Sequence, residues 1–130
     1  MNVVTGVADA LSIPVPRVFV FSGDANALVV RSGRDTIAIA TSYLQSLTRT
    51  ELEAVVSHCL VRLTPSSHRG DPVGYDDDVR AAATTRFPPA LASALTKARP
   101  YRGRFAPLYL VAEHPSHRPV AERVAALNDL

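Results

Sequence analysis

Residues Thr48 to Leu63 read TRTELEAVVSHCLVRL, and this stretch decides the fold because it carries the clearest helix signal in the chain. Thr48 and Glu51 have the spacing of a capping box, in which each side chain satisfies a free backbone N–H at the helix start. Apolar residues then recur at helical spacing, and Pro65 ends the run. The members of this stripe are Leu52, Val55, Val56, Cys59, Leu60 and Leu63. The sequence therefore predicts a helix over residues 48–63 with a wide apolar face.

On the N-terminal side of this helix, the patterns predict one helix and a small sheet. Apolar residues at helical spacing favour a helix over residues 2–12, and Pro14 and Pro16 then force an extended stretch. Short β-branched runs over residues 17–21, 27–31 and 36–41 predict strands separated by turns.

The C-terminal half is predicted to be mainly helical. Residues 66–74 form a loop, and Pro88 and Pro89 separate two helices, over residues 75–85 and 89–98. A basic loop over residues 99–107, a short strand over 108–111 and a helix over 119–127 complete the chain. We expect one domain over residues 1–130 of the α+β class, with a small, mostly antiparallel sheet packed against helices.

Composition restricts the function classes. The chain has 130 residues, 47% of them hydrophobic, and no apolar run approaches the length of about 20 residues that spans a bilayer. No basic segment precedes an apolar one at the start, and Cys59 is the single cysteine, so a cytoplasmic protein without membrane insertion is expected. The net charge is only +2, aromatic content is 6%, and Trp is absent, so nucleic-acid binding is not expected despite Arg99, Arg102 and Arg104.

His58 and Arg62 stand four residues apart on one face of the predicted helix. Zinc peptidases with the motif HExxH place two histidines at this spacing and use the intervening Glu as a general base. Residues 58–62 read HCLVR, so the first His of that motif is present and the other two groups are not.

Flanking landmarks make the comparison specific. Ile13-Pro14, Asn26-Ala27, a strand ending in Thr41, Leu47, and ELEAVVSH from Glu51 to His58 occur in this order. Gly74 to Ala81 reads GYDDDVRA, and His117 is followed by Arg123, Val124 and Leu127. In this arrangement, which covers most of the chain, the sequence resembles the HtpX and CAAX prenyl protease family of gluzincin zinc peptidases. The resemblance implies a minimal version of that peptidase domain, without the membrane helices of the family.

The resemblance also implies which groups are missing. His58 matches the first zinc ligand, Cys59 takes the place of the catalytic Glu, and Arg62 takes the place of the second His. Gly74 stands where the family has its Glu ligand, and Asp78 matches a supporting Asp. Three of the four critical groups are lost, so these positions are expected to be vestigial and the ancestral zinc site to be absent.

Other interpretations of these residues concern charge, packing and metal binding. Arg62 is predicted to form an ion pair with Asp78 or Asp76, and Cys59 is expected to be a core residue that does not face His58. The acidic run at Asp76, Asp77 and Asp78 fits the first turn of a helix. An active metallopeptidase with rearranged ligands is the alternative, and it would draw on His58, the Asp run, His68, His114 and His117.

The function expected from the sequence is that of a non-catalytic pseudo-peptidase that binds protein or peptide. Residues 27–31 or 37–41 are expected to offer an exposed sheet edge to an extended peptide, and self-association through the same edge is a second alternative. Binding of nucleic acid through residues 99–104 is a third and would be strongly salt-dependent.

Overall fold

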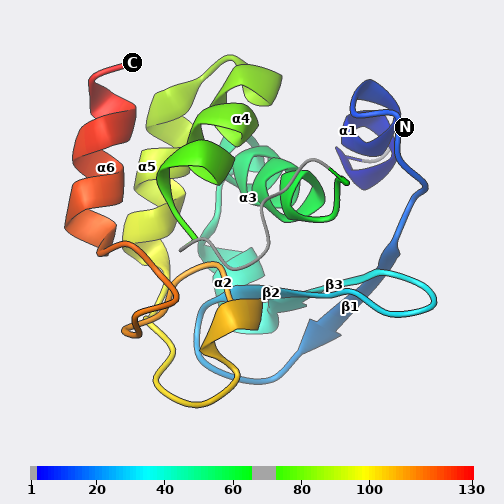
Figure 1. Cartoon of the computed structure of the whole chain (residues 1–130), viewed down its shortest axis with the longest axis horizontal. Helices are drawn as coiled ribbons and strands as arrows, with labels where there is room; N and C mark the ends of the chain where they lie inside the picture. Colours follow the sequence, from blue (N-terminus) through cyan, green and yellow to red (C-terminus); the bar gives the residue numbers. More distant parts are fainter. Residues whose placement is uncertain (1–2, 66–72) are drawn as a thin grey trace.

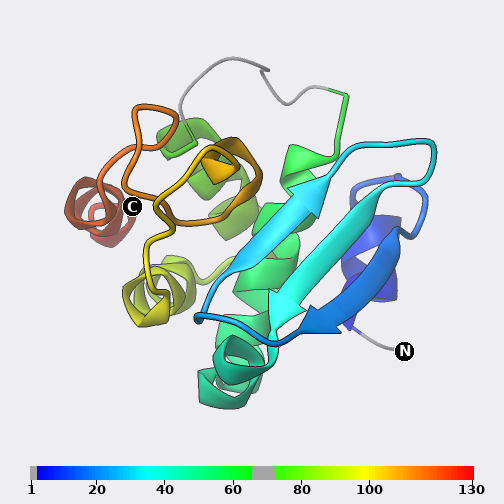
Figure 2. The same ribbon diagram turned by 90° about the horizontal axis from the view of Figure 1, so that it is seen from below.

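The fold is a three-stranded sheet with helices on one face, in a computed structural model that describes residues 3–65 and 73–130. Helix α1 (Val3–Ala10) precedes strands β1 (Arg17–Phe21), β2 (Ala27–Val30) and β3 (Thr36–Ala40). Helices α2 (Thr41–Ser46), α3 (Arg49–Arg62), α4 (Tyr75–Thr85), α5 (Pro88–Lys97) and α6 (Val120–Asn128) follow, with a short 3-10 helix, η1 (Ala106–Leu108), before α6. Figure 1 shows α1, α3, α4, α5 and α6 above the sheet, and Figure 2 shows the opposite face of the sheet uncovered.

Helix α3 forms the centre of the molecule. Its predicted capping box is confirmed: Thr48 Oγ1 accepts the Glu51 N–H at 3.2 Å, and the Thr48 N–H donates to Glu51 Oε1 at 2.8 Å. Contacts with α1, α4, α5 and β2 surround the helix, so its second half is buried on every side. The prediction of a single apolar face on this helix is therefore incomplete, because the polar residues His58 and Arg62 are buried along with the apolar ones.

The sheet has the order β1-β3-β2, with β1 parallel and β2 antiparallel to β3. It is therefore mixed, and the prediction of a mostly antiparallel sheet is only partly right. Ile37 and Ile39 of the central strand β3 are buried against the helices. Because β3 has a neighbour on both sides, residues 37–41 have no free edge for a peptide, and that half of the strand-addition prediction is wrong.

Most predicted elements have the predicted type, and two local differences have physical causes. Thr41 begins the unpredicted helix α2 rather than extending β3, and it buries Tyr43, whose hydroxyl donates to the Ala94 carbonyl at 2.6 Å. The strand predicted over 108–111 is wrong: Pro107 sits inside η1, and Tyr109 makes an isolated bridge to Leu28. The predicted loop over 66–74 lies mainly outside the described residues.

Candidate functional site

Three helices bring His58, Asp78 and Arg123 together in the interior. His58 lies midway along α3, Asp78 in the first turn of α4, and Arg123 in α6. His58 Nε2 lies 2.8 Å from Asp78 Oδ1. Arg123 donates two hydrogen bonds of 2.8 Å to the same carboxylate, from Nε to Oδ2 and from Nη2 to Oδ1. None of the three residues is more than 1% exposed, so the network is closed to solvent.

Electrostatics fix the charge states in this network. Burial lowers the pKa of His58 more than the neighbouring Asp78 raises it, so the imidazole is neutral. Burial raises the pKa of Asp78, but hydrogen bonds from Arg123 and His58 outweigh it and bring the pKa to about 2. A neutral imidazole facing a carboxylate donates from Nε2, which leaves Nδ1 unprotonated. Nδ1 is buried and has no hydrogen-bond partner among the described residues.

Arg62 does not form the predicted ion pair with Asp78 or Asp76. Its guanidinium donates instead to three backbone carbonyls around η1, those of Pro107 at 2.6 Å, Leu108 at 3.1 Å and Tyr109 at 3.2 Å. Asp78 is already occupied by Arg123, whereas the end of a 3-10 helix presents free carbonyls to a forked donor. Arg62 therefore fastens the 106–109 turn to α3, with 8% of its surface exposed.

Cys59 and Gly74 are the two other positions that the resemblance assigns to the zinc site, and both are closely packed. Cys59 is fully buried in the core, as expected, and burial raises the pKa of its thiol to about 11, so it is protonated. Gly74 precedes α4, and a Cβ placed on it would clash with Cγ of Arg118. A side chain at Gly74 therefore requires Arg118 to move.

In the part of the chain that the structure describes, the residues of the rearranged-ligand alternative do not form a metal-binding cluster. His117 Nε2 donates to the Tyr109 carbonyl at 2.5 Å, and Ser116 Oγ lies 2.8 Å from its Nδ1 and 2.9 Å from His114 Nδ1. Asp76 is exposed in the first turn of α4, as the helix-dipole interpretation predicts. Within residues 3–65 and 73–130 no three His, Cys, Asp or Glu side chains are grouped to hold a metal, and His68 lies outside these ranges.

A zinc ion therefore does not fit the residues that the resemblance assigns to it. His58 commits Nε2 to Asp78, Arg62 brings a cation, Cys59 is a protonated core thiol, and Gly74 brings no ligand. A metal bound at His58 Nε2 would have to break the buried bond from this nitrogen to Asp78, and it would meet the Arg123 guanidinium, which lies 3.3 Å from the same atom.

The edge of β2 beside this site is partly covered by the chain itself. The Leu110 N–H donates to the Ala27 carbonyl at 2.8 Å, and Leu28 bridges Tyr109 in antiparallel fashion. The Asn26 side chain bonds both backbone groups of Val111: it donates to the carbonyl at 2.7 Å and accepts from the N–H at 3.3 Å. Residues 109–111 thus occupy the start of the edge that the sequence assigned to a peptide.

Sequence reasoning named Arg123 and Asn26 only as landmarks and missed what they do. The signal for Arg123 was its position among apolar residues of the last helix, Val120, Val124 and Leu127, where an Arg needs an acidic partner. Asn26 precedes a strand, and nothing in its neighbours indicates that its side chain binds a peptide unit 85 residues away.

Arg99, Arg102 and Arg104, the basic cluster noted in the sequence, each contact a neighbouring side chain. Arg102 Nε lies 2.7 Å from Glu113 Oε2, Arg99 lies 3.5 Å from Asp24, and Arg104 covers the ring of Phe105. These side chains remain on the surface, and Asp24 and Glu113 offset the charges of Arg99 and Arg102.

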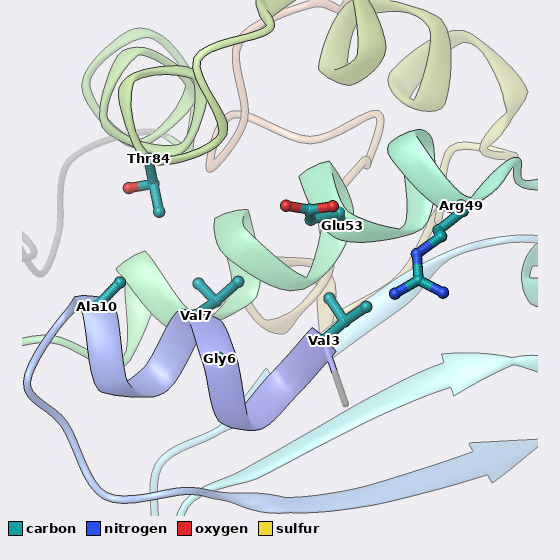
Figure 3. Close-up of a pocket in the computed structure, with 7 residues that line it drawn as sticks. All are labelled: Val3, Gly6, Val7, Ala10, Arg49, Glu53 and Thr84. Carbon is teal, nitrogen blue, oxygen red and sulfur yellow. The ribbon is translucent and has the colours of Figure 1, made fainter. Parts of the chain in front are cut away.

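A separate pocket lies between α1, α3 and α4 (Figure 3). Arg49 and Glu53 are its charged residues, and small or apolar residues of α1 form the other wall. A lone carboxylate beside an Arg offers neither a nucleophile with its base nor a metal-ligand set. This pocket therefore adds no catalytic constellation.

Comparisons with known proteins give partial matches of one kind. Over 60 residues the chain is 37% identical to the protease HtpX homolog of Janthinobacterium sp. (strain Marseille), covering 45% of this chain and 21% of that protein. Over 53 residues it is 40% identical to the protease HtpX homolog of Paracidovorax citrulli (strain AAC00-1), covering 39% of this chain and 18% of the relative. The homolog of Variovorax paradoxus (strain S110) is 38% identical over the same length.

The chain spans about a fifth of the length of these relatives. No family model and no solved structure matches it. Among the described residues, no helix is long and apolar enough to cross a membrane. The partial matches support a relation of this chain to the HtpX-like peptidases.

Proposed function

We propose that this protein is a non-catalytic relative of the HtpX-like zinc metallopeptidases, with a gluzincin-type fold that binds protein rather than cleaving it. The observation that carries the proposal is the buried His58–Asp78–Arg123 network. It ties the one zinc-ligand position retained in sequence to a carboxylate that an arginine already neutralises.

The environment of the network supports the same conclusion. Water must reach a catalytic metal, and in zinc peptidases a carboxylate takes a proton from it. His58 is fully buried, and the position after it carries the thiol of Cys59, whose raised pKa makes it a poor base at neutral pH. The proposal includes a cytoplasmic location, since a lone buried thiol suits a reducing compartment.

The test is zinc content and proteolysis measured on one preparation. Protein purified without a metal-affinity tag is assayed for zinc by plasma mass spectrometry, titrated with zinc by calorimetry, and incubated with an unfolded protein substrate. We expect substoichiometric zinc, no saturable binding heat at the His58 position, and no cleavage above that of a His58→Ala control.

One zinc per chain that disappears in His58→Ala, together with cleavage that disappears in the same variant, would overturn the proposal. Zinc that persists in His58→Ala but is lost in His114→Ala would instead support the rearranged-ligand alternative.

A further inference from the structure

Strand β1 lies at the edge of the sheet and is the most exposed apolar strand of the fold. Val18, Phe19 and Val20 are 45%, 54% and 56% exposed, whereas Ile37 and Ile39 of β3, which pair with Val18 and Val20, are buried. Figure 2 shows β1 as the outermost arrow of the sheet, and no segment within residues 3–65 and 73–130 pairs with its free side. Natural edge strands are normally protected by charges, bulges or a covering segment, and the centre of β1 has none of these.

The backbone of β1 has a defined set of free hydrogen-bonding groups. The Arg17 N–H donates to the Asp35 carbonyl at 2.9 Å, and Arg17, Phe19 and Phe21 stand opposite Thr36, Ala38 and Ala40 of β3. In a parallel pair, alternate residues direct both backbone groups toward the neighbour. Val18 and Val20 therefore direct their N–H and C=O groups outward, away from β3.

The sequence of β1, RVFVF, is almost symmetric about Phe19. If a second copy pairs antiparallel with β1 about a two-fold axis at Phe19, Val18 of each copy stands opposite Val20 of the other. Both valines already point their backbone groups outward, so each pair exchanges two hydrogen bonds. Shifting the centre to Val18 would place Val20 opposite Pro16, which has no N–H, so that register is weaker.

The side chains suit the same register. In this register Phe19 would pack against Phe19 of the second copy on the outer face of the sheet, and Arg17, the only charged residue of the strand, would stand opposite Phe21 rather than another Arg. On the inner face, Val18 and Val20 line an open groove with Ile39, Leu44, Leu52 and Val56. Pairing extends that apolar wall with the valines of the second copy.

We propose that the protein forms a two-fold symmetric dimer by antiparallel pairing of the two β1 strands, which joins the two sheets into one of six strands. Pairing closes at two copies because β3 covers the other side of β1 and residues 109–111 cover the start of β2. The dimer goes beyond the proposed function and does not depend on the absence of catalysis. A contact this short is smaller than a standard interface, so the dimer dissociates on dilution.

The first test measures the mass of the full chain in solution by sedimentation velocity over a range of concentrations. We expect the mass to rise from one chain to two with concentration, and Phe19→Glu, which places two carboxylates across the axis, to abolish the rise. Phe105→Glu is the matched control because Phe105 is similarly exposed (51%) on another surface, and it should dimerise as the wild type does. Circular dichroism confirms that both variants remain folded.

The second test reads the register by disulfide formation. Residues directly opposite in a non-hydrogen-bonded antiparallel pair have Cα atoms about 4.5 Å apart, within disulfide range. Phe19→Cys should therefore cross-link to a dimer under mild oxidation, whereas Val20→Cys, offset by two residues from its own copy, should not. Cys59 is fully buried and does not compete.

A single chain at every concentration would overturn the proposal, as would a dimer that Phe19→Glu leaves intact. Cross-linking of Val20→Cys as fast as Phe19→Cys would overturn the register.

Discussion

Among single residues, His58, Asp78 and Arg123 form a buried network of hydrogen bonds and an ion pair. Asp78 accepts from both Arg123 and His58, and Arg123 also donates to the Leu110 carbonyl at 2.7 Å. The arginine therefore joins α4 to α6 and to the segment that covers β2. Removing either Asp78 or Arg123 leaves the charge of the other uncompensated in the interior.

We expect Arg123→Ala to lower the free energy of unfolding by about 3–5 kcal/mol, the usual cost of breaking a buried pair from one side. Urea unfolding followed by circular dichroism measures it. Arg34→Ala is the control, because Arg34 is exposed at the turn between β2 and β3, and its loss should change the value little. A loss in Arg123→Ala no larger than in the control would mean that the network does not stabilise the fold.

The Arg62 guanidinium is expected to stabilise the fold through its three hydrogen bonds to backbone carbonyls. Arg62→Ala leaves three carbonyls around η1 without their donor, so unfolding free energy should fall by about 1–3 kcal/mol. Arg62→Lys should recover only part of the loss, since an ammonium on a single stem cannot span the three acceptors as the fork does. Urea midpoints of the two variants compare these effects, and full recovery by Lys would refute the role of the fork.

The sequence predicted that His58, Arg62 and Asp78 lie on neighbouring helices, but not which side chains pair. Helical spacing placed His58 and Arg62 on one face, and the acidic run placed Asp78 at the start of the next helix. Partner choice depended on α6 and η1, which approach α3 only in the folded chain. Asp78 was predicted to pair with Arg62, but it pairs with Arg123 instead. Arg62 donates to the backbone carbonyls around η1.

At the scale of the element, the start of α3 depends on local chemistry. Thr48 caps the helix, and Glu51 adds bonds from Ser93 at 2.5 Å and Lys97 at 2.6 Å on α5. The capping box therefore also joins two helices, which the sequence did not indicate.

We expect Thr48→Ala to destabilise the protein by about 1 kcal/mol, the usual cost of losing an N-cap side chain. Thr50→Ala is the control, because Thr50 is exposed in the first turn and accepts no capping bond, so its replacement by a better helix former should be neutral or slightly stabilising. Thermal unfolding of the two variants side by side checks this, and equal midpoints would argue against the cap.

The predicted elements with strong local signals kept their type. The caps, the prolines and the β-branched runs act within a few residues, so α1, α3, α4, α5, α6 and the three strands could be predicted. Strand order could not, because parallel pairing of β1 with β3 depends on where the chain crosses, not on either strand's composition. Helix α2 was missed because TSYLQS carries no capping signal and is held by burial of Tyr43.

At the scale of the whole molecule, buried titratable groups determine how the fold responds to acid. Burial lowers the pKa of His117 to about 4, from an unfolded value of about 6.5. Between these values the unfolded chain binds the proton and the folded chain does not, so stability falls as the pH drops from about 6.5 to 4. Asp78 and Glu51 have pKa values near 2 in the fold, below their unfolded values, so their contribution is lost only under more acidic conditions.

The prediction is that stability declines in two successive stages below neutral pH, and that His117→Gln flattens the first stage without altering the second. Some slope should remain in the variant, since the pKa of His58 is lowered in the same direction. Gln45→Ala is the control, because Gln45 is exposed on α2 and carries no titratable group, so it should leave the profile of the wild type unchanged. Urea midpoints measured from pH 8 to pH 3 on the three proteins decide it. A profile for His117→Gln that superimposes on the wild type would show that the buried imidazole does not link folding to pH, and the decline would then belong to His58 and the carboxylates.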